Sequence, residues 1–506
     1  MRPVAPEATP LAEVEEWLAD ALLDRRGGSG PAGHPSITGV TISSERVLPG
    51  DLYVAPAGSR AHGATFATRA VHRGAVAVLT DPDGAAVAAE TSVPVLVVEH
   101  PRAVVGDLAA RIYRHPAERL RLVGVTGTQG KTTTTRLAEA ALTATGVPTA
   151  AVGTLGTRVA GEDVKTTLTT PEATDLHALF AVMVERGVVA CVMEVSSHAL
   201  VMGRVDGVVF DVACFTNLGR DHLDFHADVE DYFAAKASLF TPQRSRRGLV
   251  NVDDPFGRRL VHEATVPVRT FSPSGADADW RATDVRLEPT ASTFTLHTPA
   301  GETVPVRVPL TGGFNVANAL CAVAALAEAG FDAAVVASSL AATHGVPGRL
   351  EQVEAGQDFL AVVDYAHKPD AVTAALAALR PLTAGRLLVV LGAGGERDPG
   401  KRPIMGEVAA RLADVLVVTD DNPRGEEPAA IRSELLAGAR SVPPAQRAEV
   451  EEVGDRRAAI RRAVRLARAG DTVLVAGKGH ETGQEVAGVV HPFDDRVVLR
   501  EELAAR

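Results

Sequence analysis

The sequence has few cysteines, no excess of positive charge and no long apolar run, and each absence excludes a class of protein. Three cysteines, Cys191, Cys214 and Cys321, lie too far apart for metal-ligand spacing, so we expect small buried side chains. A formal charge of −12 argues against a nucleic-acid scaffold. No apolar run approaches the ~20 residues that span a bilayer, and the start lacks a basic segment followed by an apolar one. We therefore expect a cytoplasmic protein without nucleic-acid or membrane partners.

What the sequence does contain is a regular alternation of short apolar runs with helical patterns. With 506 residues the chain exceeds what one core usually organises. Continuous apolar runs that end in Gly, Asp or Asn are typical of buried parallel strands, with functional residues at their carboxyl ends. This pattern predicts an α/β fold. The runs are AVAVLT, RLVGVTG, VVACVMEV, FLAVVDYAH, RLLVVLGAGG, DVLVVTDDNP and DTVLVAGKGH.

Two seams divide the chain. The first is the loop YRHPAERL before Leu120, and the second is THGVPGRLE, where a helix expected from about Asn315 to Leu340 gives way to a turn. The sequence therefore predicts three domains, at residues 1–115, 116–346 and 347–506.

The strongest local signal is GVTGTQGKTTTTRLAEAAL, which begins at Gly124. An apolar strand leads into a glycine-rich turn and then a helix, as a phosphate-binding loop requires. Gly127 and Gly130 let backbone N–H groups point inward, Lys131 offers a cation to the β- and γ-phosphates, and Thr132 can bind Mg²⁺. The usual spacing has a glycine at position 125, where this chain has valine. We expect ATP or GTP to contact Gly127, Thr128, Gln129, Gly130, Lys131, Thr132 and Thr133.

Seven strings occur in one order over about four hundred residues. Together they closely resemble the Mur ligase family, and within it the UDP-N-acetylmuramoyl-tripeptide synthetases. The resemblance implies a UDP-binding N-terminal domain, a central ATPase domain with a parallel sheet, and a Rossmann-like C-terminal domain that binds the incoming amino acid. The strings are TGTQGKTT, MEVSSHAL, TNLGRDHLDFH, GGFNVANAL, PGRLE, DYAHKPDA and DNPR.

The resemblance also implies a metal centre beside the nucleotide. Glu194 and His222 would help to hold a second Mg²⁺, with Thr132 on the first. Lys236 resembles the lysine that reacts with CO₂ to form a carbamate, an anion able to bind Mg²⁺. In DYFAAKASLF the residues Tyr232, Lys236 and Phe240 share one helical face. The alternative is a lysine that reaches the surface from an aromatic stripe.

Further contacts follow from the resemblance alone. Asn315, Asn318, Arg349 and Asp364 are implied at adenine and ribose; the alternative for the two asparagines is a helix N-cap and an exposed polar residue. The UDP-muramyl dipeptide is expected at Ser44, Ser59, Arg60 and Ala61, although SSER stands where a common family form reads DSR. Its peptide end is expected at Thr169, Thr170, Ser196, Met202 and Arg204, and Met202 is Gln in some relatives.

The last predicted domain has three polar clusters, each directly after an apolar run. If these strands are parallel, the clusters meet at one edge of the sheet. Two arginines and two acids suit a ligand with a carboxylate and an ammonium at its far end, as in diaminopimelate, whereas an arginine only repels lysine. The alternative is an Asp-Asn-Pro turn with a solvated arginine. The predicted contacts are Arg397, Asp421, Asn422, Pro423, Arg424, Gly477 and Glu481.

The resemblance implies the reaction as well. The D-Glu carboxylate of UDP-N-acetylmuramoyl-L-alanyl-D-glutamate attacks the γ-phosphate of ATP, and the amine of meso-2,6-diaminopimelate attacks the resulting acyl phosphate in peptidoglycan precursor synthesis. Lys131 and Mg²⁺ would stabilise charge, and no residue is assigned as general base. The competing hypotheses are a folylpolyglutamate synthase, a P-loop switch protein and a non-catalytic nucleotide-sugar scaffold. The stereoisomer of the diamino acid and tolerance of lysine or ornithine stay open, and we expect a monomer.

Overall fold

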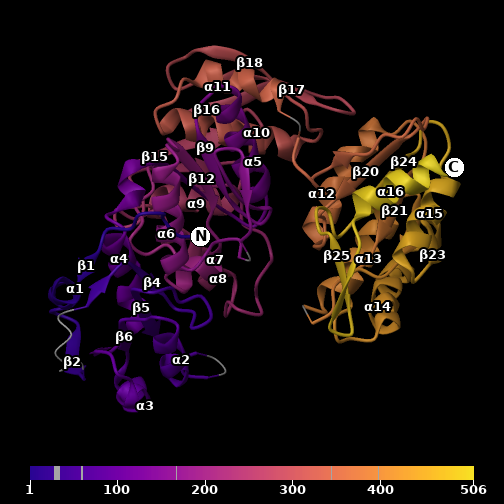
Figure 1. The fold of residues 1–506 in the computed structure, drawn as a ribbon. Coiled ribbons are helices and arrows are strands. Elements are labelled where there is room, and N and C mark those ends of the chain that lie inside the picture. The colour runs from indigo at the N-terminus through magenta and orange to yellow at the C-terminus, as the bar shows by residue number, and fades with distance from the viewer. Residues whose placement is uncertain (28–34, 59–60, 167, 344, 397) are drawn as a thin grey trace.

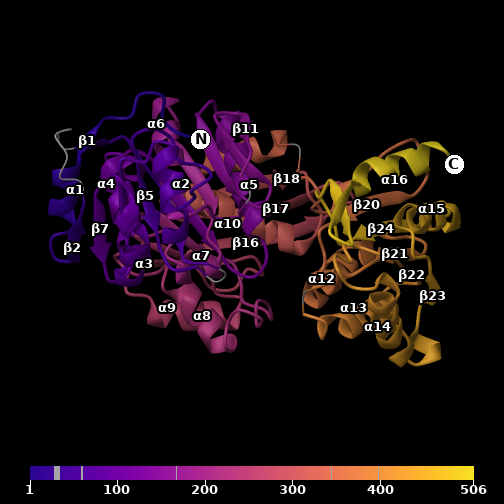
Figure 2. The same cartoon turned by 60° about the horizontal axis from the view of Figure 1, so that its bottom comes forward.

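The computed structural model describes residues 1–27, 35–58, 61–166, 168–343, 345–396 and 398–506. Helices and strands alternate along them and build three main sheets, of five, eleven and six strands. Figures 1 and 2 show the third sheet and its helices standing beside the rest of the chain. The α/β class predicted from the alternating apolar runs is confirmed.

The first sheet joins four parallel strands to one antiparallel edge strand, β2. Its four parallel strands are short buried runs rich in Val, Leu and Ala, as expected for a sheet covered on both faces, whereas β2 is mostly exposed. Its order is β2 (Leu22–Arg26), β7 (Val95–Val98), β6 (Ala77–Thr80), β5 (Asp51–Ala55) and β4 (Gly39–Thr41). The other elements here are β1 (Thr9–Pro10), β3 (Ser36–Ile37), α1 (Leu11–Trp17), α2 (Ala67–His72), α3 (Pro82–Val87) and α4 (Pro101–Ile112).

The second sheet is parallel in its centre and antiparallel at both ends. Its order is β11 (Glu162–Val164), β10 (Gly156–Val159), β9 (Thr149–Gly153), β12 (Ala190–Glu194), β8 (Arg121–Thr126), β13 (Val212–Phe215), β14 (Gly248–Asn251), β15 (Val268–Ser272), β16 (Trp280–Leu287), β17 (Ser292–His297) and β18 (Thr303–Val308). Strand β8 therefore delivers the glycine-rich loop from the middle of the sheet.

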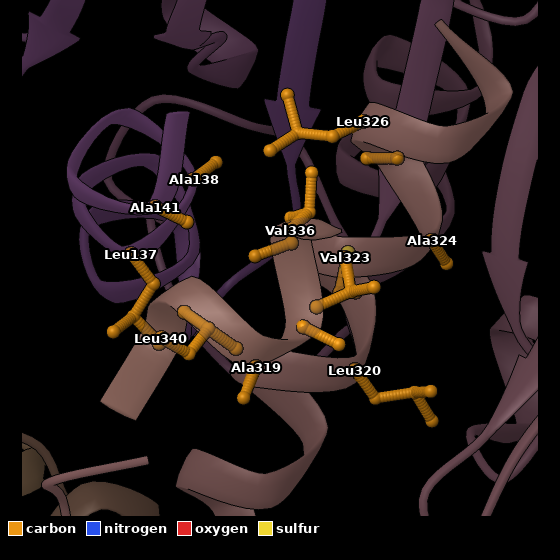
Figure 3. Packing of buried hydrophobic residues seen from close by; sticks show 14 of the residues in the cluster. Leu137, Ala138, Ala141, Ala319, Leu320, Val323, Ala324, Leu326, Val336 and Leu340 are labelled. Atoms are coloured by element: carbon orange, nitrogen blue, oxygen red, sulfur yellow. The ribbon is translucent and has the colours of Figure 1, made fainter. Parts of the chain in front are cut away.

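Helices cover both faces of this second sheet. They are α5 (Lys131–Ala144), α6 (Ala173–Glu185), α7 (Ser197–Val201), α8 (Val229–Ala237), α9 (Pro255–Glu263), α10 (Gly313–Glu328) and α11 (Ala333–Ser339). Figure 3 shows how α5, α10 and α11 pack through small residues such as Ala138, Ala141 and Ala319. Alanines at these positions let the helices approach closely, so the helix that follows the glycine-rich loop is held against α10.

The third sheet supplies three neighbouring parallel strands, β24, β21 and β22. Its order is β19 (Glu351–Gln352), β20 (Leu360–Asp364), β24 (Thr472–Ala476), β21 (Leu387–Leu391), β22 (Val415–Val418) and β23 (Glu449–Glu452). The hairpin β25 (Gly483–Val486) and β26 (Val489–Pro492) follows β24. The helices are α12 (Pro369–Leu379), α13 (Lys401–Leu412), α14 (Pro428–Ser441), α15 (Arg456–Leu466) and α16 (Asp495–Ala504).

All seven apolar runs form the predicted strands, and each pairs in parallel with a neighbour. The single helix expected from Asn315 to Leu340 is wrong, because α10 ends at Glu328 and Gly330, at φ 102°, breaks the chain before α11. Phe240 lies beyond the end of α8, so it does not continue the helical face of Tyr232 and Lys236.

The predicted domain boundaries stay a prediction, although each of the three sheets lies inside one of the predicted ranges. The three cysteines are buried and free, as expected. Within the described part of the chain, no helix combines the length and the apolarity that a membrane crossing needs.

Candidate active site

A cavity of about 580 Å³ lies where the second and third sheets face each other. Its walls include the glycine-rich loop, the ends of β12 and β13, one face of α10 and the loop that follows β20. The carboxyl ends of parallel strands therefore form the floor, which is where α/β folds build ligand sites.

The glycine-rich loop has no room for side chains at two positions. A Cβ at Gly127 would lie 2.0 Å from Oγ1 of Thr216, and one at Gly130 would lie 2.4 Å from Oδ1 of Asn318. Both glycines also have positive φ, at 142° and 88°. Val125, which stands where the usual motif has glycine, is still inside β8. The turn begins two residues later, so valine there is compatible with the loop.

Helix α5 begins directly at the cavity. Its N-cap is Gly130, which offers no side-chain acceptor to the first N–H groups of the helix. Lys131, Thr132 and Thr133 line the cavity at this helix end. A positive helix terminus with a lysine beside it can bind phosphate groups.

Two lysines converge on one carbonyl group of this loop: Lys131 is partly buried and Lys236 is fully buried. Nζ of Lys131 donates to O of Gly127 at 2.7 Å and to O of Thr128 at 3.1 Å. Nζ of Lys236 donates to the same Gly127 oxygen at 2.9 Å and lies 4.5 Å above the ring of Tyr232. Lys236 is 1% exposed, which excludes the alternative in which it reaches the surface.

Neither lysine finds a carboxylate partner within hydrogen-bond distance in the described structure. Burial lowers the pKa of Lys131 to about 8, although Glu194 opposes this shift. Burial, together with the charge of Lys131, lowers the pKa of Lys236 well below its usual value. The two lysines therefore favour binding of an anion at the centre of the cavity. When the amine of Lys236 is neutral, it is a nucleophile.

Glu194 ends strand β12 and faces the cavity. Its carboxylate accepts hydrogen bonds from N and Oγ1 of Thr154, at 2.8 Å and 3.1 Å. A Cβ at Gly153 would lie 2.2 Å from Oε1 of Glu194, so glycine gives the carboxylate its space. Glu194 and Thr132 thus bring hard oxygen ligands to one cavity, as Mg²⁺ prefers.

His222 lines the same cavity, and Asp221 precedes it in the chain. Nε2 of His222 is 2.9 Å from Oδ2 of Asp221, and Asp221 also pairs with Nζ of Lys368 from the third sheet. Burial alone would raise the pKa of Asp221, but His222 and Lys368 lower it well below its usual value. His226 instead bonds Ser197 and Asp231 at 2.9 Å and 3.1 Å, which fits a structural role.

The predicted adenine and ribose contacts include residues of the same cavity that lie next to the glycine-rich loop. Asn318, Arg349 and Asp364 line it, whereas Asn315 stands behind Asn318 and accepts from its Nδ2 at 3.1 Å. Both asparagines are buried inside α10, whose N-cap is Gly312, so the alternative of an N-cap and an exposed residue is wrong. Arg349 stacks on Tyr365 at 4.7 Å and reaches Oγ1 of Thr132 at 3.3 Å.

The residues expected at the muramyl peptide gather beside Glu194. Oγ1 of Thr170 donates to O of Glu194 at 2.9 Å, and Oγ1 of Thr169 lies 3.1 Å from that of Thr154. Arg204 donates to O of Thr170 at 3.4 Å and to Sδ of Met202 at 3.4 Å. Ser196 lines the same wall.

The residues expected at uridine lie apart from this group. Ser44 is buried in the body of the first sheet and Ala61 is exposed there. In the described part of the chain, neither of them lines the cavity beside the glycine-rich loop. Ser59 and Arg60 lie outside the described residues.

A second cavity, of about 490 Å³, lies at the carboxyl ends of β21, β22 and β24. Asp421, Asn422, Arg424, Gly477 and Glu481 line it, so the structure brings these predicted residues together. Pro423 follows Asn422 in the same loop, and Arg397 lies outside the described residues. The two cavities share the wall residues Thr169, His222, Tyr365, His367 and Lys368.

Comparison with known proteins gives matches to one family. Three family models match the chain: the Mur ligase family catalytic domain at residues 36–113, the Mur ligase middle domain at 125–326 and the Mur ligase glutamate ligase domain at 348–479. A relative from Streptomyces avermitilis, a UDP-N-acetylmuramoyl-L-alanyl-D-glutamate–2,6-diaminopimelate ligase, is 58% identical over 99% of this chain and 98% of its own. The chain belongs to the Mur ligase family.

Solved structures of Mur ligases agree with this. A structure of a UDP-N-acetylmuramoyl-L-alanyl-D-glutamate–2,6-diaminopimelate ligase is 31% identical, covers 94% of this chain and 97% of that one, and has a TM-score of 0.67. A folylpolyglutamate synthase from Mycobacterium tuberculosis is 19% identical, covers 74% of this chain and 92% of that one, and has a TM-score of 0.60. The second likeness shows the fold alone.

The sequence did not identify every residue at the two cavities of this Mur ligase. Lys368 and Tyr365 lie in the shared wall, Lys401 lines the second cavity, and Lys478 is buried behind it. Lys368 lies within DYAHKPDA and Lys478 lies between Gly477 and Glu481, so both belong to segments that the sequence predicts at the site. Whether these two lysines reach a cavity depends on the direction of their side chains, which neither sequence segment reveals.

Proposed function

We propose that this Mur ligase joins the D-Glu carboxyl group of UDP-N-acetylmuramoyl-L-alanyl-D-glutamate to an amine of 2,6-diaminopimelate, with ATP as the source of activation. The observation that carries the proposal is the wall common to the two cavities. A carboxyl group activated beside the glycine-rich loop would lie next to a compartment able to hold an amino acid. Holding both reactants side by side removes much of the entropic barrier.

The reaction would run in two steps. A carboxylate oxygen of the substrate attacks the γ-phosphorus of ATP, the bond to the β,γ-bridging oxygen breaks, and ADP leaves. The amine nitrogen then attacks the acyl carbon, phosphate leaves with the former carboxylate oxygen, and the nitrogen loses a proton. Lys131 and the α5 terminus would stabilise the phosphoryl oxygens. The base that takes the proton is left unassigned.

Thr132 would hold a first Mg²⁺, and Glu194 and His222 would help to hold a second Mg²⁺. Among the described residues no three His, Cys, Asp or Glu side chains form a metal cluster, so water and phosphate oxygens would complete each shell, as is usual for this ion. The ion would neutralise phosphate charge when bound. Lys236 as an ammonium group does not suit a metal site, because it has no lone pair.

A carbamate at Lys236 would remove that conflict. The ammonium group first loses one proton, and the neutral amine nitrogen then attacks the carbon of CO₂ and releases a second proton, which leaves an anion with two oxygens in place of a cation. The lowered pKa of Lys236 supports this step, since only the neutral amine reacts. The charge of Lys131 nearby would stabilise the product.

Diaminopimelate as the amino acid rests on the second cavity and on the relatives. The guanidinium group of Arg424 can bind a carboxylate of the amino acid, and the carboxylates of Asp421 and Glu481 can bind its ammonium group. The relative from Streptomyces avermitilis and the 31% identical structure are both named as diaminopimelate ligases. We propose a cytoplasmic, monomeric enzyme with domains at residues 1–115, 116–346 and 347–506.

The decisive experiment measures ADP and phosphate release with ATP, Mg²⁺, UDP-muramyl dipeptide and a panel of diamino acids. We expect turnover only when all substrates are present, with diaminopimelate best, and a product heavier by one residue. A P-loop switch would hydrolyse nucleotide without the muramyl substrate. A folylpolyglutamate synthase would need a folate instead, and a scaffold would release no ADP.

Arg424→Ala tests the assignment of the second cavity. We expect KM for diaminopimelate to rise by about 100-fold, the loss of a charge-assisted carboxylate contact, while ADP affinity stays within about twofold. Titration calorimetry with ADP and steady-state kinetics measure the two quantities. Equal loss of both would show that the amino acid binds elsewhere.

A further inference from the structure

Lys478 occupies an unusual position at the second cavity. It follows strand β24 in the turn Gly477–Lys478–Gly479, where both glycines have positive φ, at 121° and 54°. A Cβ at Gly477 would lie 2.3 Å from Oδ2 of Asp421, and one at Gly479 would lie 2.7 Å from Cβ of Tyr365. This turn therefore forces the lysine inward, and its side chain is fully buried.

Every polar neighbour of the Lys478 ammonium group lines the cavity. Nζ donates to Oδ1 of Asn422 at 2.8 Å and to Oε2 of Glu481 at 3.3 Å, and it lies 4.0 Å from Oδ1 of Asp421. Lys478 itself stands behind these three residues. It contacts the residues that would touch an amino acid without lining the cavity.

The first consequence is the orientation of the Asn422 amide. Its Oδ1 accepts from Lys478 and, at 3.0 Å, from N of Glu485, while its Nδ2 donates to Oε2 of Glu481 at 2.8 Å. Two donors at one oxygen fix the amide so that only its nitrogen can turn toward a ligand. Asn422 then presents a donor on the same wall as Arg424, which suits a carboxylate.

The second consequence is the charge of the compartment. Two carboxylates, Asp421 and Glu481, and one ammonium group, Lys478, leave one net negative charge near the place where a ligand ammonium would bind. Without Lys478 the same carboxylates would carry two negative charges and repel a ligand carboxylate.

We propose that Lys478 is a positioning residue that sets the specificity of the amino-acid cavity, by fixing the Asn422 amide and by neutralising one carboxylate. The proposal rests on the proposed function, since it takes the second cavity as the amino-acid site. It assigns the donor side of the cavity to the distal carboxylate of the ligand and the Glu481 side to the distal ammonium group. Loss of Lys478 should therefore affect recognition of the carboxylate most.

The test uses three ligands that differ only at the distal end. Diaminopimelate carries both charges, 2-aminopimelate carries the carboxylate alone, and L-lysine carries the ammonium group alone. For Lys478→Met in the full-length enzyme, we expect KM for diaminopimelate to rise about 10- to 100-fold, the loss expected for a charged hydrogen bond. The inhibition constant of 2-aminopimelate against diaminopimelate should rise at least as much, and that of L-lysine should change by less than about threefold. Affinity for ADP should stay unchanged.

Lys165→Met is the matched control, because Lys165 is exposed and lies in neither cavity. Glu481→Gln and the double variant Glu481→Gln/Lys478→Met give a second readout, which does not need a folded Lys478→Met single variant. Once Glu481→Gln has removed one carboxylate, the further change Lys478→Met should raise KM by less than about tenfold, because the charge imbalance is gone and only the contact to Asn422 is lost. Equal losses for all three ligands, or a rise of about tenfold or more on the Glu481→Gln background, would overturn the proposal. Failure of the proposed function is a separate result, in which the unaltered enzyme forms no product with diaminopimelate.

Discussion

The lysines of the two cavities have different partners. Beside the glycine-rich loop, Lys131 and Lys236 share one carbonyl oxygen and lack a carboxylate partner among the described residues. At the third sheet, Lys478 lies among Asp421, Asn422 and Glu481. The first cavity is cationic and needs an anion from outside, while the second is nearly balanced by its own side chains.

This difference matches the ligands that each cavity would receive. ATP brings several negative charges, so uncompensated cations gain the most from its binding. A diamino acid at neutral pH carries opposite charges at each end, so it needs a compartment with a donor side and an acceptor side. The charge of each cavity therefore indicates which one receives the nucleotide and which one receives the amino acid, without reference to the shape of either ligand.

Lys236→Ala tests whether the first cavity depends on an anion at this position. If Lys236 becomes an anionic carbamate that supports the metal, kcat should fall on the order of 100- to 1000-fold, the range for loss of one strong electrostatic contact at the reacting phosphate. Phosphate release at saturating substrates measures it. Lys165→Ala, at an exposed lysine, should leave kcat unchanged. Unchanged turnover in Lys236→Ala would show that the cationic cavity works without an internal anion.

Much of this arrangement can be predicted from the sequence. Parallel strands end at one edge of a sheet, so clusters that directly follow apolar runs must converge there, and Asp421, Arg424 and Glu481 do. The glycine-rich loop is a local signal in which strand, glycines and helix lie within a few residues. Both predictions need only the chain order and the class of fold.

Contacts between distant segments could not be predicted in this way. Asp221 and Lys368 are 147 residues apart and belong to different sheets, so nothing in their neighbourhoods indicates that they pair. The sequence does not indicate the break at Gly330, because an alanine-rich helical pattern resumes directly after it. The sequence also does not indicate that Lys478 points inward, because its direction depends on two glycines whose positive φ the motif alone does not reveal.

The ion pair between Asp221 and Lys368 lies where the two cavities meet. Asp221→Asn should leave the partly buried Lys368 ammonium group without its carboxylate and lower kcat by about 10- to 100-fold. Adding Lys368→Met should cost less than the product of the two single effects, because the partners act as one unit. Phosphate release measures each variant.

The control for this pair is an exposed ion pair on helices α8 and α9. Arg259 pairs with Glu230 and Glu263 at the surface, so Arg259→Met should change kcat by less than about twofold. Independent losses for Asp221→Asn and Lys368→Met would mean that the two residues serve the separate cavities and do not couple them.

The smallest expected effect concerns pH and the charge of Lys131. Burial lowers its pKa to about 8, so the amine is protonated below that pH and loses its proton above it. The protonated form binds phosphate, and therefore ADP affinity should be flat below about pH 8 and fall by up to about tenfold per pH unit above it. Calorimetry in EDTA between about pH 7.5 and 9.5 measures this without metal. Lys131→Arg stays charged throughout that range and should abolish the fall. If the unaltered protein and Lys131→Arg show parallel profiles, Lys131 keeps its proton despite burial. The first cavity would then favour an anion less strongly than its contacts indicate.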